Sequence, residues 1–123
     1  MARERFFAVF GLGSFGREIC RYLTDHGAAV VAVDKNAQLI ERIQDEVAQA
    51  ILIDSTDEDS LADVPLEDVE AAVVAMGESV ESSILTTAIL KKIGVPRVIA
   101  RAVSEIHLRV LQQIGADEVV NLE

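Results

Sequence analysis

The chain has 123 residues, half of them hydrophobic, with a formal net charge of −10 and a sequence pI near 4.6. This length suits a single domain with one core, and the negative charge argues against nucleic acid or an anionic membrane surface as the main partner. No apolar run approaches the roughly 20 residues that span a bilayer, and the charged N-terminus is not typical of a signal peptide. We therefore expect a soluble, cytoplasmic protein with no direct membrane insertion.

Short β-rich runs alternate with amphipathic stretches along the whole chain. The runs predict strands at residues 6–10, 29–33, 50–53, 71–75, 98–101 and 118–120. The stretches between them predict helices at residues 15–26, 37–45, 80–93 and 106–114, and a short helix after Thr56, whose hydroxyl could cap it. Most of the strands are almost continuously apolar, so we expect them to be buried on both faces. Six strands alternating with five helices predict an α/β fold, a Rossmann-type, doubly wound parallel six-stranded sheet that forms a single domain.

A glycine-rich turn follows the first predicted strand and opens the first predicted helix. In this context Gly11 permits the tight turn, Gly13 lets a pyrophosphate approach the backbone, and Gly16 lets the helix pack on the sheet. The helix N-terminus then offers N–H groups and a partial positive charge to phosphate. An acid, Asp34, ends the second strand 18 positions after Gly16. Together these features predict a dinucleotide- or mononucleotide-binding site.

Polar residues follow the second and third predicted strands. Asp34 could accept hydrogen bonds from both hydroxyls of a ribose, and it would repel a 2′-phosphate, which disfavours NADP. Asn36 could either add ribose contacts or cap the next helix. Asp54 and Ser55 follow the third strand, at the border of the expected adenine position. There Asp54 could accept a hydrogen bond from the adenine amine, or it could be an ordinary cap of the following helix.

The fourth and fifth predicted strands end at the same edge of the sheet. Gly77 follows the fourth strand and would allow a ligand to approach the backbone closely. Arg101 ends the fifth strand, as the only cation expected at this edge. Its guanidinium would either contact a phosphate or pair with Glu78.

The remaining reactive residue types form no catalytic set. His26 and His107 lie in predicted helices, and we expect both at the surface. Cys20 is expected to be a small buried residue. No Cys/His cluster has the spacing of a metal site, and no serine has the surroundings of a nucleophile elbow. We therefore expect a protein that is not an enzyme.

Five stretches of the sequence resemble the N-terminal lobe of the RCK (regulator of potassium conductance) family, especially the Ktr/Trk-type cytosolic subunits of bacterial potassium uptake. The matching stretches are residues 7–16, 33–36, 85–91, 94–96 and 114–117. The first two are common to many Rossmann proteins. The third and the last, Leu-Thr-Thr-Ala-Ile-Leu-Lys and Ile-Gly-Ala-Asp, are more particular.

The resemblance implies a regulatory subunit that gates a membrane-embedded potassium channel or transporter from the cytoplasmic side of the membrane. It implies binding of ATP/ADP or NAD(H), and assembly into homodimers and a larger ring. The nucleotide contacts that it implies are Gly11, Gly13, Ser14, Phe15, Asp34, Asn36, Asp54, Ser55, Gly77 and Arg101. It also implies that Glu123 lies near a divalent cation at a dimer interface.

The sequence departs from this family in two respects. Related sequences often carry arginine where this chain has Ser14, and that arginine helps to hold phosphates. Family members also usually continue into a regulatory C-terminal lobe, so residues 1–123 correspond to the N-terminal lobe alone. The alternative is a domain or subunit of an NAD-dependent oxidoreductase.

Overall fold

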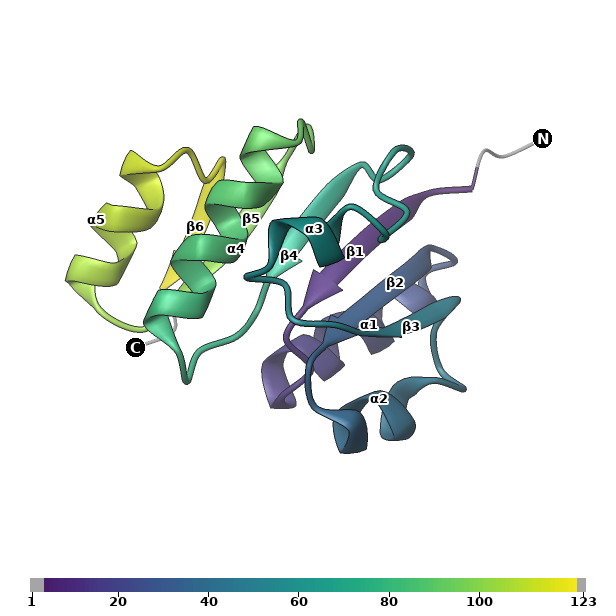
Figure 1. Ribbon diagram of the computed structural model, residues 1–123. Helices are drawn as coiled ribbons and strands as arrows, with labels where there is room; N and C mark the ends of the chain where they lie inside the picture. The colour runs from purple at the N-terminus through teal and green to yellow at the C-terminus, as the bar shows by residue number, and fades with distance from the viewer. Residues whose placement is uncertain (1–3, 122–123) are drawn as a thin grey trace.

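The computed structural model describes residues 4–121, in which six strands alternate with five helices (Figure 1). All strand pairs in this part of the chain are parallel, and their order across the sheet is β3-β2-β1-β4-β5-β6. The predicted doubly wound, parallel six-stranded sheet is therefore confirmed. The strands are β1 (Phe6–Phe10), β2 (Ala29–Asp34), β3 (Gln49–Leu52), β4 (Ala71–Val74), β5 (Val98–Ala102) and β6 (Glu118–Asn121). The helices are α1 (Ser14–Asp25), α2 (Ala37–Ile43), α3 (Glu58–Leu61), α4 (Val80–Lys92) and α5 (Glu105–Gln113).

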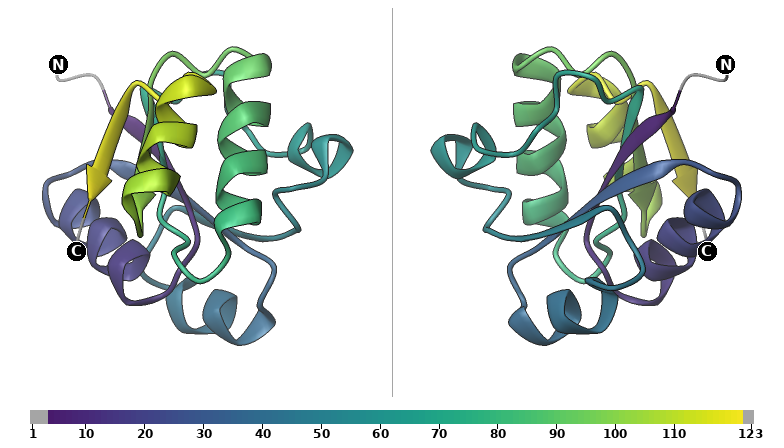
Figure 2. Two further views of the ribbon diagram at one scale, coloured as in Figure 1. Left: turned by 90° about the vertical axis from the view of Figure 1, so that its left-hand side faces the viewer. Right: turned by 90° about the vertical axis from the view of Figure 1, so that its right-hand side faces the viewer.

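Alternate residues of the central strands point to opposite faces of the sheet and build two cores. Ala8 and Phe10 of β1 belong to the core that α3, α4 and α5 cover, whereas Val9 belongs to the core that α1 and α2 cover. Figure 2 shows these helices as two layers on either side of the sheet. The central strands are therefore buried on both faces, as their continuous apolar runs predict.

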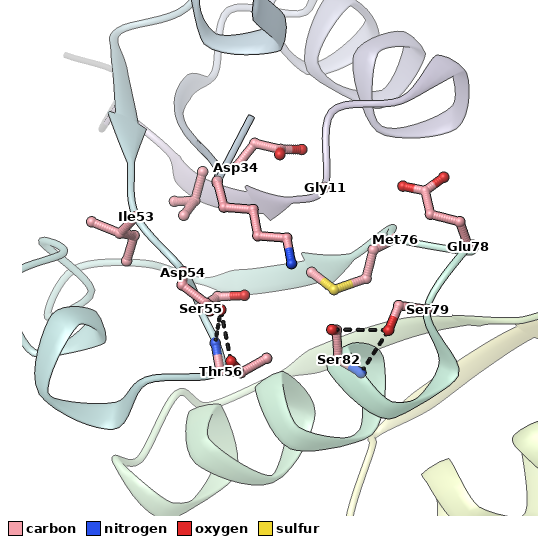
Figure 3. Close-up of a pocket in the computed structure, with 12 residues that line it drawn as sticks. Gly11, Asp34, Ile53, Asp54, Ser55, Thr56, Met76, Glu78, Ser79 and Ser82 are labelled. Carbon is pink, nitrogen blue, oxygen red and sulfur yellow. Dashed lines mark hydrogen bonds between the residues drawn. The ribbon is translucent and has the colours of Figure 1, made fainter. Parts of the chain in front are cut away.

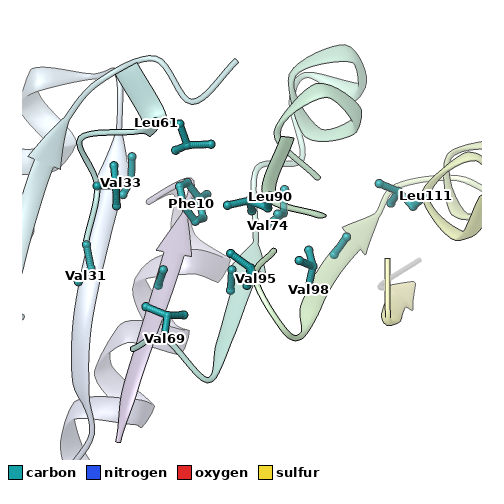
Figure 4. Packing of buried hydrophobic residues seen from close by; sticks show 14 of the residues in the cluster. Phe10, Val31, Val33, Leu61, Val69, Val74, Leu90, Val95, Val98 and Leu111 are labelled. Atoms are coloured by element: carbon teal, nitrogen blue, oxygen red, sulfur yellow. The ribbon is translucent and has the colours of Figure 1, made fainter. Parts of the chain in front are cut away.

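The larger core is almost entirely aliphatic. Leu61, Leu90 and Leu111 come from three different helices and have no exposed surface. They pack around strand residues such as Phe10 and Val74 (Figure 4). Burial of these side chains is the main force that holds α3, α4 and α5 on the sheet, at roughly 1.5–3 kcal/mol for each large aliphatic side chain.

The glycine-rich turn has the geometry that its residues predict. Gly11 adopts φ +95°, and a Cβ at this position would lie 2.7 Å from the backbone nitrogen of Met76. A Cβ at Gly16 would overlap the carbonyl oxygen of Gly11. These two glycines therefore let the chain turn sharply and let α1 begin directly against the sheet.

Two local expectations are wrong, and one is confirmed. Asp57, not Thr56, caps α3, by accepting a hydrogen bond from the amide of Asp59; the hydroxyl of Thr56 donates to Asp54 instead. His107 is only 1% exposed, because its face of α5 packs against α4, so it is not a surface residue. Cys20 is buried as expected, and this burial raises the pKa of its thiol to about 12.

Among residues 4–121 no helix combines the length and the hydropathy that crossing a bilayer requires.

Candidate functional site

A cleft opens at the carboxyl edge of the sheet, where β1, β2, β3 and β4 end (Figure 3). In an open parallel sheet ligands bind at this edge, at the point where the strand order reverses. Here that point is β1, which lies between β2 and β4. The residues that line the cleft are Gly11, Val33, Asp34, Lys35, Ile53, Asp54, Ser55, Thr56, Met76, Glu78, Ser79 and Ser82.

The N-terminus of α1, beside this cleft, differs from the other helix N-termini in residues 4–121. Gly13 is its N-cap and supplies no side-chain hydrogen bond, and the first turn of α1 contains no acid. The other four helices are capped by the side chains of Asn36, Asp57, Ser79 and Ser104. The first amides of a helix have no partner within the helix. The amides and the positive dipole end of α1 are therefore available to an anion.

The space in front of this N-terminus is open. A Cβ at Gly13 would meet no atom within 4 Å, and its φ of −67° is accessible to any residue. Gly13 is therefore not required by the turn itself, in contrast to Gly11 and Gly16. Its lack of a side chain leaves room for a group that approaches the helix N-terminus.

Asp34 ends β2 and is held by backbone groups on both sides. Its Oδ2 accepts from the amide of Leu12 at 2.8 Å, and its Oδ1 accepts from the amide of Asn36 at 2.9 Å. Each carboxylate oxygen has capacity for a further hydrogen bond. The carboxylate thus ties the glycine turn to the end of β2 and can still accept from two ligand hydroxyls.

The Asn36 side chain serves as a helix cap. Its Oδ1 accepts from the amides of Gln38 and Leu39 at 2.9 and 3.4 Å, and Asn36 does not line the cleft. The sequence left two roles open for Asn36, ribose contacts or a helix cap, and the structure shows the helix cap.

Asp54 and Ser55 both line the cleft, after β3. The carboxylate of Asp54 accepts from the hydroxyl of Thr56 at 2.7 Å and from its amide at 2.9 Å, and these hydrogen bonds lower the pKa of Asp54. Ser55 is buried, and its hydroxyl is 2.8 Å from that of Thr86 on α4. Asp54 therefore stays ionised and oriented, whereas the hydroxyl of Ser55 already has a partner.

Arg101 and Gly77 lie outside the lining of the cleft. The guanidinium of Arg101 lies 5.3 Å from the ring centroid of Phe15, and a Cβ at Gly77 would lie 2.8 Å from its Nη1. Gly77 therefore makes room for this side chain. No ion pair between Arg101 and Glu78 occurs among residues 4–121. Arg101 is also not the only cation at this edge, because Lys35 lines the cleft directly after β2.

A second hollow lies beside the glycine turn. Gly13 and Ser14 line it together with two cationic residues, Arg17 of α1 and Arg42 of α2. Of the glycine-turn residues, only Gly11 borders the main cleft. Gly16 is buried beneath the turn, and Phe15 is the residue on which Arg101 stacks.

Eight residues that line the cleft were not among the sequence-based candidates. Six of them lie within four positions of a strand end, so the rule that ligands bind at the carboxyl edge could have found them: Val33, Lys35, Ile53, Thr56, Met76 and Glu78. Ser79 and Ser82 are the exceptions. They begin α4, and the path of the chain after β4 brings them to the cleft, where Ser79 donates to Ser82 at 2.9 Å.

No metal centre is found in the part of the chain that the structure describes, since no group of three or more His, Cys, Asp or Glu side chains occurs there. The expected cation ligand, Glu123, lies outside the described residues.

The fold and the arrangement of its carboxyl edge define a Rossmann-type domain. Residues 7–122 match the family model of the TrkA-N domain, and the chain belongs to this family.

Curated relatives agree with this assignment. The chain is 40% identical over 117 residues to the Ktr system potassium uptake protein C of Bacillus subtilis and to the Ktr system potassium uptake protein A of Vibrio alginolyticus. Each match covers 95% of this chain and 53% of the relative. The chain therefore spans about half the length of the curated relatives that it matches.

Solved structures share the fold. The NAD(P)-binding domain of an exopolyphosphatase-related protein from Archaeoglobus fulgidus is 30% identical, with a TM-score of 0.85, and the match covers 98% of this chain and 89% of that one. The GsuK channel bound to NAD has a TM-score of 0.83 at 18% identity, over 96% of this chain and 21% of the channel chain. At that identity the likeness to the channel shows the fold alone.

Proposed function

We propose that this domain is a non-catalytic, adenine-nucleotide-sensing regulator of a potassium uptake system. One observation carries the nucleotide-binding part of the proposal: the uncapped N-terminus of α1 lies beside a cleft that also holds the oriented carboxylate of Asp34. A helix N-terminus suits phosphate, and a carboxylate at the end of the second strand suits ribose hydroxyls. The likeness to the NAD(P)-binding domain from Archaeoglobus fulgidus, at 30% identity, supports this assignment.

In the proposed complex the sugar and base occupy the main cleft. Asp34 accepts hydrogen bonds from the ribose hydroxyls, and Asn36 supports that region by capping α2. Asp54 and Ser55 border the adenine, where the ionised carboxylate of Asp54 accepts from the exocyclic amine.

The phosphates lie in front of α1, against the backbone of Gly11 and Gly13. Ser14, Phe15 and Gly16 supply the first-turn amides of the helix. Gly77 and Arg101 close the far side of the phosphates, with Arg101 held in place by its contact with Phe15.

The relatives, which are Ktr system potassium uptake proteins about twice as long as this chain, support the regulatory part of the proposal. In the proposal the domain assembles into homodimers and a larger ring, on the cytoplasmic side of a membrane-embedded potassium channel or transporter subunit. Glu123 holds a divalent cation between protomers. A nucleotide can shift such an assembly only if it binds two of its states with different affinities.

The first test is nucleotide binding by this chain. Isothermal titration calorimetry with ATP, ADP, AMP, NAD⁺ and NADH is expected to detect binding of at least one of them. Gly13→Val should abolish it with little loss of stability, since a Cβ at this position meets no protein atom but occupies the space in front of α1. Circular dichroism and urea denaturation verify the fold of the variant.

Three results would contradict the proposal. If no nucleotide binds, or if the folded Gly13→Val variant binds as well as the native protein, the phosphate does not lie in front of α1. Catalytic consumption of NADH with a candidate substrate would instead favour the oxidoreductase.

A further inference from the structure

The charges that line the cleft are unevenly balanced. Three carboxylates, those of Asp34, Asp54 and Glu78, face one ammonium group, that of Lys35. The hydrogen bonds that Asp54 accepts from Thr56 keep it ionised. The cleft is therefore negative before any ligand enters, in a protein whose formal net charge is already −10.

Glu78 is the carboxylate on the phosphate side of the cleft. Asp34 lies at the expected ribose position and Asp54 at the expected adenine position, whereas Glu78 follows β4. Figure 3 shows its carboxylate directed towards the side of the cleft that Gly11 borders, where the glycine turn leads into α1. Glu78 is exposed and makes no ion pair among residues 4–121. A phosphate in front of α1 therefore has, on the cleft side, a carboxylate that is not held in an ion pair.

Three arginines lie near the glycine turn but outside the lining of the main cleft. Arg17 and Arg42 line the second hollow together with Gly13 and Ser14, and Arg17 also lies 3.6 Å from the carboxylate of Glu46. Arg101 stacks on Phe15 outside the lining of the cleft. One guanidinium on the far side suits the internal pyrophosphate of a dinucleotide. The cleft itself offers no cation on that side to a longer phosphate chain.

We propose that Glu78 is a specificity-determining residue, which makes the cleft prefer NAD-type dinucleotides to ATP. This inference rests on the proposed function, because it assumes a nucleotide with its phosphates in front of α1. The pyrophosphate of NAD⁺ is internal and has no terminal phosphate, and its nicotinamide ring adds a positive charge. ATP brings a longer chain with a terminal phosphate of higher charge, so it is repelled more strongly by a carboxylate on that side of the cleft.

The experiment compares the native protein with two charge-neutralising variants. NAD⁺, ADP and ATP are titrated in the presence of EDTA into the native protein, Glu78→Gln and Glu81→Gln. Glu81 is the matched control, because it lies three residues further along in the first turn of α4, is exposed and does not line the cleft. We expect the native protein to bind NAD⁺ about tenfold or more tightly than ATP. Glu78→Gln should strengthen ATP binding by about fivefold and change NAD⁺ binding by less than about twofold, while Glu81→Gln leaves both unchanged.

Several outcomes would overturn the inference while leaving the proposed function intact. Native protein that binds ATP as tightly as NAD⁺ is one, and equal effects of the two Gln substitutions are another. In a parallel titration with Mg²⁺, ATP binding that rises to the level of NAD⁺ and is lost in Glu78→Gln would make Glu78 a metal ligand instead. An ATP preference that disappears in Arg42→Gln would show that the phosphates run into the other hollow. If the native protein binds no nucleotide, the proposed function itself fails.

Discussion

Helix α4 has polar residues on two faces, one beside the cleft and one buried inside the protein. On one side Ser79 and Ser82 are partly exposed and line the cleft. On the other side Ser83 has no exposed surface and forms, with the buried His107 of α5, a polar seam. Thr86 and Thr87 of α4 are also buried, and the hydroxyl of Thr86 pairs with that of Ser55. In the seam the hydroxyl of Ser83 lies 3.1 Å from Nε2 of His107.

The protonation of the seam follows from its hydrogen bonds. Nδ1 of His107 accepts from the amide of Val103 at 3.1 Å, so the ring proton is on Nε2 and is donated to Ser83. One step along α4, from Ser82 to Ser83, thus leads from a partly exposed serine beside the cleft to one whose loss leaves a buried donor unpaired. In this helix the residue type does not show whether a serine lines the cleft or stabilises the core. The face of the helix on which the serine lies decides between these two roles.

The largest expected effect is on stability, and it concerns Gly16 in the glycine turn beside the cleft. Gly16→Val should destabilise the protein by about 3 kcal/mol or more, because its side chain would have to fit where the carbonyl of Gly11 lies. Urea denaturation measures the change. Gly13→Val is the matched control, and its free energy of unfolding should stay within about 1 kcal/mol of the native value. Equal losses of unfolding free energy in the two variants would contradict the different structural roles of Gly16 and Gly13.

A smaller effect should separate the two faces of α4. Ser83→Ala leaves the Nε2 proton of His107 without its partner and should lower the free energy of unfolding by about 1–3 kcal/mol. Ser82→Ala, one residue away on the cleft side, should change it by less than about 0.5 kcal/mol. Both values come from the same denaturation experiment. A larger loss in Ser82→Ala than in Ser83→Ala would contradict the division between seam and cleft.

The smallest effect concerns pH. Burial lowers the pKa of His107 in the folded protein below the value of about 6.5 for an unfolded chain. The unfolded state then binds the proton more readily, so stability is fully present above about pH 6.5 and declines as pH falls from there towards the folded pKa. The slope is at most about 1.4 kcal/mol per pH unit for one such group.

Denaturation at several pH values between 7.5 and 5 checks this expectation. His107→Gln should flatten the profile in this range, whereas replacement of the exposed His26 should not. A profile that is already flat in the native protein would mean that His107 is not held neutral in the seam.

Local pattern and composition were enough to determine the fold class and the centre of the candidate site. Continuous apolar runs identify strands buried on both faces, and the alternation of strands with helices leaves few topologies besides the doubly wound sheet. Gly11, Gly16 and Asp34 could be assigned because their roles depend on the turn directly after a strand, within a few residues of the chain. The family resemblance rests on these motifs and, more particularly, on residues 85–91 and 114–117.

Only the tertiary structure decided which polar residues lie at the surface and which lie in the cleft. His107 is on a helix of mixed character, and only the packing of α5 against α4 makes it a buried partner of Ser83. Lys35 and Ser82 reach the cleft because strands that are distant in the chain end at one edge of the sheet. These outcomes depend on contacts between residues far apart in sequence, whereas periodicity and spacing describe only the surroundings of each residue along the chain.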